Sequence, residues 1–584
     1  MKSYKKSKKF RTTIIILIFL LISGIIASPI LTSYRMIIGV DGFFHFHRFY
    51  DAAMQIQNND FHYFTSFYGF NQSGRMVNPT YGPVFAYFNG ILLLIMGNWI
   101  RWQFAINFLV TFGGLFSSYI ALRWLNLRKI YSFIGALLIF GLMPTLSWYT
   151  DQSFMNIGSF LLPLAVSISI NMVKSTERPI KPIQMGSVVA LGLQLHMLSA
   201  LFMVIIMVLF AIPALFKVIN KTKFILKGCQ AAGLALLLSV NVWVPIIYLN
   251  HDNILLRPFI EGQGDSAANT IGFTWDGSHG ITIVLSIMVI FSLVSVGYSL
   301  IYKKIMPFEV FYTLLIGLLF ICFSTQFIPW RPIMSNQHII LSMFQFPMRF
   351  AIPGSVIIIM GLLDWGRSFS WINEKNIELI SLTVAALSIV MIFSPIADKL
   401  ANIKSQNELG GDKVLYQPGL TPEKLLSDER NQNLSLLIKD GFTDYPDYLP
   451  ISKKTKDALS PSDWYNTNGL DYEYRKEFIF NPLHLESKTI RNRKIYLSWS
   501  SNNLKKIILP VVKYKDTQIV VNGGNVSKGS NIFTKLGAPI VNQKIGVNKA
   551  VIWYKTPSWF IYTQLLPVIS LMLVLIYIVF KKRK

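Results

Sequence analysis

A short polar stretch near the start of the chain carries the residue types best suited to chemistry. Residues 39–50 read GVDGFFHFHRFY, and a helix that starts near Asp41 would place Asp41, His45 and Arg48 at positions i, i+4 and i+7 of one face. A carboxylate at that position could act as a general base toward a hydroxyl group. His45, His47 and Arg48 could hold a phosphate, since an arginine fork matches phosphate oxygens. The stretch therefore predicts a site for a phosphate-bearing substrate.

The alternative for this stretch is a helix that only lies at a membrane surface. Its polar residues are interspersed with the aromatic residues Phe43, Phe44, Phe46, Phe49 and Tyr50. Aromatic side chains gather at bilayer interfaces, and an amphipathic helix with a merely wetted polar face accounts for them. It accounts less well for an aspartate, two histidines and an arginine within residues 41–48, so we favour a functional site.

Three further candidates lie where polar and apolar stretches meet. Asp151, in SWYTDQSFMN, is an acidic residue at a membrane edge, and the alternative is an N-cap for a helix before Phe154. His196, in LQLHMLSA, lies inside an apolar stretch that must turn back on itself, and a histidine satisfied between helices is its alternative. Tyr81 lies in the proline-rich stretch NPTYGP at residues 78–83, for which a simple stiff turn is the alternative.

The polar loop at residues 326–349 supplies the last candidates. It contains Arg331 and ends in FQFPMRF at residues 344–350, which contains Gln345 and Arg349. Arg349 would lie where a helix enters the membrane from outside, against the tendency of basic residues to stay inside. We therefore expect an anionic partner for Arg349, either a lipid headgroup or a substrate phosphate, with Gln345 helping to fix its direction.

Composition indicates that these candidates belong to an integral membrane protein. The chain has 584 residues, of which 52% are hydrophobic and only 14% charged, whereas soluble domains carry about 25% charged residues. The formal net charge of +26 would suggest nucleic acid on a soluble protein, but here the basic residues cluster in short loops between apolar runs, and we expect no nucleic-acid partner. Cys229 and Cys322 lie in apolar runs and indicate neither disulfides nor a cysteine metal site.

Thirteen apolar runs are candidates for spanning helices, each of which needs about 20 residues. The runs are 13–32, 82–98, 103–124, 131–150, 155–173, 183–196, 197–216, 228–250, 281–302, 307–325, 350–366, 376–396 and 559–580. Basic loops predict cytoplasmic N- and C-termini, an uncleaved first helix, and an outer location for residues 33–81, 251–280, 326–349 and 397–558.

The topology does not close at the sequence level. Thirteen crossings are an odd number, whereas two cytoplasmic termini need an even one. The conflict lies between Tyr81 and Asp151, because strict alternation places Arg123, Arg128 and Lys129 outside. Either one segment there is re-entrant or this basic loop breaks the rule.

The expected fold is a polytopic α-helical membrane protein of about 12–14 spans with a β-rich domain before the last helix. Residues 1–396 form the transmembrane domain with its catalytic first outer loop, 33–81, and residues 397–558 form an extracytoplasmic domain. Residues 559–584 form the final helix and a basic tail. Short alternating runs at 495–500, 506–512, 517–524 and 550–555 predict antiparallel strands. A rigid cap without chemistry is the alternative for this domain.

Taken together, these stretches resemble the GT-C glycosyltransferase superfamily. The sequence is most similar to bacterial YfhO-like proteins and to the membrane family labelled "6-pyruvoyl-tetrahydropterin synthase-related". The matching pieces are DGFFHFHR (41–48), NPTYGP (78–83), LHM (195–197), FQFPMRF (344–350), DYLP (447–450), PVVKY (510–514), VVNG (520–523) and VIWYKTP (551–557). They extend along the whole chain. Two positions depart from the family pattern: Met348 replaces a typical tryptophan, and no arginine follows Asp151.

The resemblance implies an enzyme that takes a sugar from a polyprenyl-phosphate carrier on the outer face of a bacterial, Gram-positive cell membrane. It implies Asp41 as catalytic base, and His45, Arg48, His196, Gln345 and Arg349 as contacts for the donor phosphate or sugar. The acceptor would be teichoic acid, another envelope polymer or a glycolipid. Some relatives use a divalent metal between two outer carboxylates, and here Asp41 and Asp151 could form such a pair.

Two other classes of function remain open. One is a transporter or flippase of lipid-linked envelope precursors, although the two related halves common in transporters are not visible. The other is a non-catalytic envelope assembly protein in which the outer domain binds a polymer. The sequence has no P-loop, no strand-linked GxGxxG and no HExxH motif, which argues against ATP-driven transport and against a cytoplasmic nucleotide-sugar site.

Overall fold

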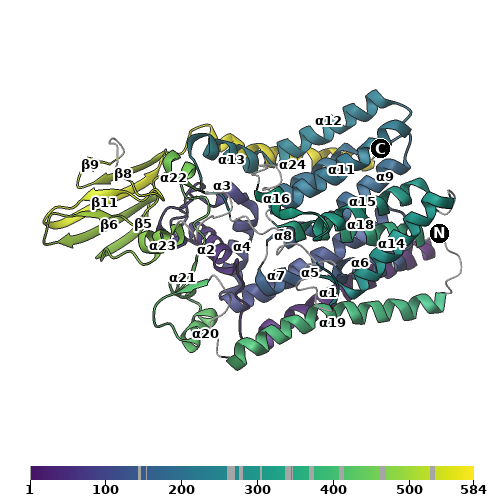
Figure 1. The fold of residues 1–584 in the computed structure, drawn as a ribbon, viewed down its shortest axis with the longest axis horizontal. Helices are drawn as coiled ribbons and strands as arrows, with labels where there is room; N and C mark the ends of the chain where they lie inside the picture. Colours follow the sequence, from purple (N-terminus) through teal and green to yellow (C-terminus); the bar gives the residue numbers. More distant parts are fainter. Residues whose placement is uncertain are drawn as a thin grey trace. The chain divides into compact units, whose positions relative to one another are not determined.

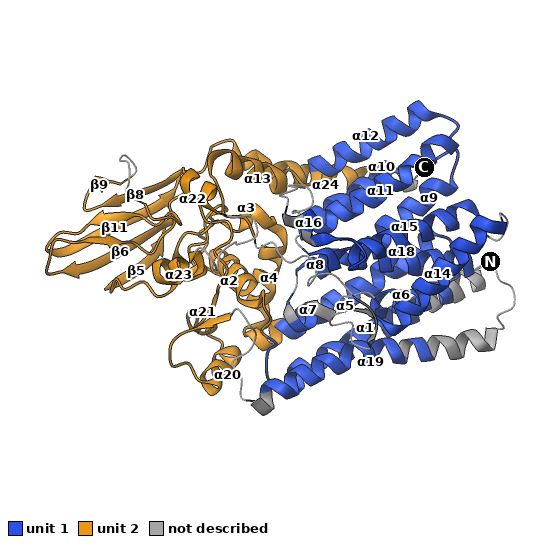
Figure 2. Cartoon of the chain, in the orientation of Figure 1, with its two compact units in different colours: residues 1–37, 103–237, 263–407 blue, residues 38–102, 238–262, 408–584 orange. Residues whose placement is uncertain are grey.

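The computed structural model of the chain describes residues 2–142, 146–152, 154–258, 270–274, 280–302, 306–335, 344, 346–366, 374–406, 414–459, 469–526 and 533–583. The fold is mostly helical, at 66%, with a β-containing region near the C-terminus (Figure 1). Packing divides the chain into two compact units (Figure 2). Unit 1 comprises residues 1–37, 103–237 and 263–407, and unit 2 comprises residues 38–102, 238–262 and 408–584.

Unit 1 consists almost entirely of helices. They are α1 (Lys2–Ser33), α5 (Trp99–Trp124, which starts in unit 2), α6 (Lys129–Leu142), α7 (Leu146–Asp151), α8 (Met155–Ser159), α9 (Leu162–Lys174), α10 (Pro182–Leu195), α11 (Met197–Lys217), α12 (Lys221–Leu238), α14 (Ile283–Tyr302), α15 (Phe308–Ser324), α16 (Trp330–Ser335), η2 (Pro347–Phe350), α18 (Ala351–Gly366) and α19 (Glu374–Gln406). A short parallel pair, β1 (Thr270–Thr274) and β2 (Gly280–Thr282), precedes α14.

Small residues and one buried ion pair hold unit 1 together. A Cβ on Gly317 of α15 would lie 2.7 Å from Ile358 of α18, so the missing side chain lets the two helices approach closely, as small residues do in membrane bundles. Lys174, at the end of α9, pairs with Asp364 of α18 at 2.5 Å, and the aspartate is 2% exposed. Removing either partner would leave the other charge buried, so this pair fixes α9 against α18.

In the part of the chain that the structure describes, each of the thirteen apolar runs expected from the sequence falls mainly on helical structure. Within the described residues, eight helices are long and apolar enough to span a membrane: Thr12–Ser33, Trp99–Trp124, Met155–Lys174, Met197–Lys217, Ile283–Tyr302, Pro347–Gly366, Ala386–Ile403 and Phe560–Lys581. The pair formed by α12 and α13 (Val240–Asp252) is apolar enough to count as a ninth if it is one broken span, and it is bent by 73° at its junction. Four shorter apolar helices, of 13–17 residues, are α4 (Val84–Met96), α6, α10 and α15.

Unit 2 combines three separate stretches of chain. Its helices are α2 (Gly42–Gln57), η1 (Phe70–Gln72), α3 (Asn78–Tyr81), α4, α13, α20 (Pro422–Arg430), α21 (Ser435–Asp440), α22 (Lys453–Ala458), α23 (Leu470–Tyr474), η3 (Arg475–Ile479) and α24 (Phe560–Arg583). Its strands are β3 (Val414–Tyr416), β4 (Gly441–Thr443), β5 (Ser487–Arg491), β6 (Lys494–Ser501), β7 (Lys506–Ile508), β8 (Thr517–Val521), β9 (Gly524–Asn525), β10 (Ile540–Asn542) and β11 (Gly546–Tyr554).

The strands confirm the β-rich region expected near the C-terminus. Five of them form an antiparallel sheet in the order β5-β6-β11-β8-β9, and β7 pairs with β10. Side chains alternate between buried and half-exposed along β6 and β8, as period-two patterning requires. Ile495, Trp499 and Ile552 lie on the buried face, where they contribute to one apolar core.

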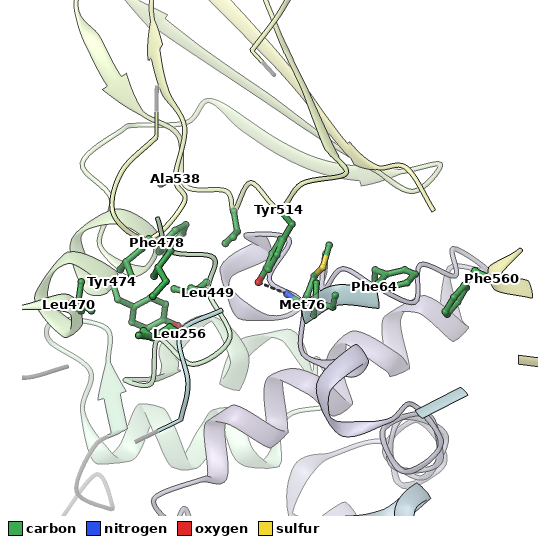
Figure 3. Close-up of a cluster of buried hydrophobic side chains, with 14 residues drawn as sticks. Phe64, Met76, Leu256, Leu449, Leu470, Tyr474, Phe478, Tyr514, Ala538 and Phe560 are labelled. Carbon is green, nitrogen blue, oxygen red and sulfur yellow. Dashed lines mark hydrogen bonds between the residues drawn. The ribbon is translucent and has the colours of Figure 1, made fainter. Parts of the chain in front are cut away.

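A second apolar core joins the three stretches of unit 2 (Figure 3). Phe64 and Met76 come from the first stretch, Leu256 from the second, and Tyr514 from the third. The Met76 backbone N–H donates to the Tyr514 hydroxyl at 3.1 Å, and this hydroxyl donates to the Tyr448 carbonyl at 3.1 Å. From residue 38 onward, the first outer loop expected from the sequence therefore belongs to the same compact unit as most of the domain expected at 397–558.

Helix α4 belongs to unit 2 and packs against α2. A Cβ on Gly90 would lie 2.7 Å from the backbone nitrogen of Ala53, so the two backbones touch there. The Tyr87 hydroxyl donates to Gln55 of α2 at 2.6 Å. The opposite face of α4 carries an apolar stripe at helical spacing whose residues are 44–69% exposed: Val84, Phe88, Ile91 and Ile95.

Replacing Gly90 with alanine should destabilise unit 2. The added methyl group meets the backbone of α2, which cannot move aside, and such overpacking costs about 1–3 kcal/mol. Gly113→Ala in α5 is the matched control, because nothing lies within 4 Å of its Cβ position. Thermal unfolding of the purified protein in detergent measures both. A Gly90→Ala midpoint equal to that of Gly113→Ala would contradict the close packing of α2 and α4.

Candidate functional site

The helix predicted to begin near Asp41 is α2, and the structure confirms it. Asp41 occupies its N-cap position, and the His45 backbone N–H donates to the Asp41 carbonyl at 3.3 Å. Asp41 is half-buried, whereas the residues from Gly42 to Ala53 are buried. The carboxylate therefore lies at the accessible end of an otherwise enclosed helix. A helix N-terminus also favours a negative charge.

Tyr81 is the common neighbour of the three residues expected on one face of α2. The His45 and Tyr81 rings lie 5.9 Å apart, edge to face, and the Arg48 guanidinium carbon lies 5.2 Å from the Tyr81 ring centre. Burial raises the pKa of Tyr81 to about 12, and the charge of Asp41 adds to this increase. Asp41, His45 and Arg48 are thus gathered in one place, as their spacing predicted, and the fold adds Tyr81 to them.

Arg48 holds the turn that presents Tyr81. Its Nε donates to the Asn78 side-chain oxygen at 3.0 Å, and one Nη donates to the Gly82 carbonyl. Gly82 has φ +79°, a left-handed conformation that favours glycine, and α4 begins two residues later. The NPTYGP stretch is therefore a one-turn helix followed by a tight turn. Arg48 itself is fully buried, and burial lowers its pKa to about 10.

His47 is placed as a structural residue. One ring nitrogen bonds the Gly441 carbonyl at 2.9 Å, and the other accepts the Phe70 backbone N–H at 3.0 Å. The ring therefore carries its proton on Nε2 and is neutral. Burial lowers the pKa of His47 to about 4, despite the opposing bond from Gly441, and Arg75 lowers it further. Both ring nitrogens of His47 are bonded to backbone groups of the protein, so no ring N–H is left to donate to the phosphate expected from the sequence.

The segment Asp444–Tyr448 adds residues that sequence reasoning did not place in the site. The Tyr448 hydroxyl lies 3.5 Å from the Tyr81 hydroxyl. Burial raises the pKa of Tyr445, and the charges of Asp41 and Asp447 raise it further. The carboxylates of Asp41 and Asp447 therefore act on the same phenols, although more than 400 residues separate them in the chain. The DYLP motif at residues 447–450 was the sequence signal that could have placed this segment in the site.

Arg75 holds the segment Asp444–Tyr448 in place, and sequence reasoning did not identify it as a residue of the site. Its guanidinium donates to the Asp447 carbonyl at 2.5 Å and to the Tyr474 hydroxyl at 3.2 Å. It also stacks near the Phe44 and Phe70 rings, at 5.4 and 5.2 Å. A fully buried arginine between the first loop and residues 447–474 joins the two sides of the site. It gave no signal in the sequence, because only the tertiary fold brings its partners together.

The arrangement suits proton transfer at a half-buried carboxylate. Asp41 lies beside phenolic hydroxyls whose pKa values burial raises, so they stay protonated and can donate hydrogen bonds. Low polarity around the site strengthens every charge interaction in it. Among the described residues, no group of three or more His, Cys, Asp and Glu side chains is placed to hold a metal ion. Asp41 belongs to unit 2 and Asp151 to unit 1, so a shared metal stays an expectation.

The remaining candidates belong to unit 1. His196 joins α10 to α11 and accepts the Ser199 backbone N–H at 3.2 Å, so it caps α11 at the expected reversal of the chain. Asp151 is the last residue of α7 rather than an N-cap before Phe154. The Lys399 ammonium donates to the carbonyl of Thr150, the preceding residue, at 2.5 Å. A basic group thus reaches the Asp151 region from α19, although no arginine follows Asp151 in the sequence.

Arg349 of the FQFPMRF stretch lies at the start of a helix, as expected from the sequence. Arg349 lies in η2 directly before α18, donates to the Phe344 carbonyl at 3.2 Å and stacks on the Phe346 ring at 4.8 Å. Arg331 lies in α16, with its backbone described and its side chain outside the description. Gln345 lies outside the described residues.

The buried neutral state of His47 makes stability depend on pH. In the unfolded chain a histidine takes up its proton near pH 6.5, whereas folded His47 does so only near pH 4. Stability should therefore fall as pH drops from about 6.5 to 4, by up to roughly 3 kcal/mol from this residue. His47→Gln should be less stable at pH 7.5 but lose less on acidification. The largely exposed His251→Gln should keep the wild-type profile. Thermal unfolding at several pH values measures this, and identical slopes for wild type and His47→Gln would contradict it.

Comparison with protein-family models and with curated proteins found no relative of this chain, since no family model matches it and no curated protein does either. The function must therefore be argued from the residues and their arrangement.

Proposed function

We propose that the chain is a multi-pass membrane glycosyltransferase that moves a sugar from a polyprenyl-phosphate carrier to a hydroxyl group of a cell-envelope acceptor. The observation that carries the proposal is the position of Asp41 at the accessible end of α2, with Tyr81 shared by Asp41, His45 and Arg48. A base near partly enclosed hydroxyl donors is what such a transfer needs. The GT-C-like order of motifs supports the same proposal.

In the proposed reaction, Asp41 accepts the proton of the acceptor hydroxyl. The acceptor oxygen forms a bond to the anomeric carbon while the bond from that carbon to the phosphate oxygen breaks, and the lipid phosphate leaves with the electron pair. A single displacement inverts the anomeric centre. The buried Arg48 acts through Tyr81, because its fork is bonded to the turn at Asn78 and Gly82.

The proposed topology has twelve crossings, with α4 lying at the outer surface of the membrane. Two features support this assignment: α4 belongs to unit 2, where it packs against α2 along one face, and it exposes an apolar stripe along the other. With α4 removed from the count, crossings are even. The basic residues Arg123, Arg128 and Lys129 then lie inside, as the positive-inside rule requires.

Cysteine labelling tests this topology. In a Cys229→Ser, Cys322→Ser background, Phe61→Cys should react with a membrane-impermeant maleimide on intact cells, since Phe61 is exposed and proposed to be outside. Arg128→Cys should react only after permeabilisation, like the inner control Lys223→Cys. Labelling of Arg128→Cys on intact cells would mean that α4 crosses the membrane.

Sugar transfer by Asp41→Asn tests the proposed activity. Membranes with matched expression receive radiolabelled polyprenyl-phosphate sugars as donors, and label in polymer or lipid is counted. Loss of a general base should lower transfer by at least about 100-fold. Asp457→Asn, the same change on the exposed face of α22, should leave transfer unchanged.

Each other outcome has a definite meaning. Equal transfer by wild type and Asp41→Asn would remove Asp41 from the chemistry. A full donor panel without transfer by wild type would contradict the enzyme and favour a transporter or an assembly protein.

A further inference from the structure

The outer face of the five-stranded sheet in unit 2 has a pattern that the proposed reaction does not use. Arg491 of β5 lies opposite Lys494 of β6, Lys494 opposite Trp553 of β11, and Trp553 opposite Gln518 of β8. These four side chains form one row across four strands, about 14 Å long at the usual strand spacing. Tyr496 occupies the next row on the same face, opposite Val551.

Cations lie over both aromatic rings of this face. The Lys494 ammonium lies 5.0 Å from the Trp553 ring centre, and the Arg491 guanidinium carbon lies 5.1 Å from that of Tyr496. Both rings are half-buried, while Arg491 and Lys549 are exposed. Strands β5, β6, β8 and β11 contain no aspartate or glutamate. The four strands therefore join flat apolar surface to positive charge and contribute no carboxylate of their own, while the Asp60 carboxylate accepts the Arg493 backbone N–H at 2.8 Å at the β5–β6 turn.

The whole module around this sheet is strongly basic. Residues 481–560 contain thirteen lysines and arginines against two acidic residues. Such an excess of one charge attracts a polyanion and concentrates it near the surface. The four strands contribute no acidic residue, so the basic side chains of the sheet have no acidic partner within these strands.

We propose that this row, Arg491–Lys494–Trp553–Gln518 together with Tyr496, is a docking platform for an anionic glycan chain. Trp553 and Tyr496 offer flat faces to sugar rings, Arg491 and Lys494 pair with phosphate or carboxylate groups, and the Gln518 amide bonds sugar hydroxyls. The platform is a binding site that the proposed transfer reaction does not require. Only the identification of the bound glycan as the acceptor rests on that reaction.

A lipid surface fits the same charges less well. Proteins that dock on bilayers place aromatic and aliphatic side chains outermost, where they enter the headgroup region. On this face the cations cover the rings, and the rings are half-buried. A chain lying along the row can reach both the cations and the ring edges. We therefore assign the row to an anionic glycan and make lipid an outcome of the test.

Binding of polygalacturonate, which carries a carboxylate on each sugar, tests the platform. The full chain in zwitterionic lipid nanodiscs should bind polygalacturonate oligosaccharides more tightly than neutral dextran. Arg491→Glu with Lys494→Glu should weaken this binding by about tenfold or more. Lys505→Glu with Lys506→Glu, an equal charge reversal at exposed positions of the same module, should change it by less than about twofold. Trp553→Ala should also weaken binding, with Trp553→Phe restoring part of it.

The remaining outcomes overturn the proposal or separate it from the catalytic one. Equal weakening by the two charge reversals would show diffuse attraction, and unchanged binding in both would remove the row from recognition. Phosphatidylglycerol vesicles that bind the wild type but not Arg491→Glu with Lys494→Glu, with no binding of polygalacturonate, would assign the face to lipid. Asp41→Asn should bind polygalacturonate like the wild type. Row-dependent binding in a chain without transfer activity would contradict the glycosyltransferase but retain the platform.

Discussion

Unit 2 depends on the burial of its first stretch against its last. Phe64 and Met76 enter an apolar core with Leu449, Tyr474 and Tyr514, and the Tyr514 hydroxyl bonds the chain on both sides of that core. This packing fixes residues 60–83, and they in turn fix α2, because Arg48 and His47 bond their backbone and side chains. A helix that sequence alone would leave on a loop thereby becomes enclosed. The position of Asp41 follows from that enclosure.

The polar residues of α2 and its N-cap differ in burial, and this difference indicates different roles for them. His47 and Arg48 have their bonds within the protein, and the low pKa of His47 shows how strongly its charged form is disfavoured there. In the proposed reaction they would build the site rather than contact a substrate. Asp41, at the half-buried end, keeps access to one. The tyrosines near it stay protonated because burial and nearby carboxylates raise their pKa values. In the proposed reaction, the catalytic and positioning roles would thus be separated along less than three turns of one helix.

The β-module and the α2 site belong to the same packed unit, which gives the proposed functions a common scaffold. The inner face of the sheet is an apolar core around Trp499 and Ile552, and its outer face carries the basic row with Trp553. Strand alternation alone produces this division, since neighbouring residues point to opposite faces. One packed unit would then hold both the sheet that binds the polymer and the base that activates a hydroxyl group of that polymer. Binding to the sheet would therefore raise the local concentration of the acceptor near the base.

The sequence by itself determined the local elements. Apolar runs became helices, alternating runs at 495–500, 517–524 and 550–555 became strands, and the spacing of Asp41, His45 and Arg48 placed them on one helical face. These features depend on periodicity within a few turns, which neighbouring residues encode. The tertiary structure alone decided that α4 packs on α2, that His47 is structural, and that Asp447, Tyr448 and Arg75 complete the site. Those outcomes depend on contacts between segments separated by tens to hundreds of residues, which no local pattern records.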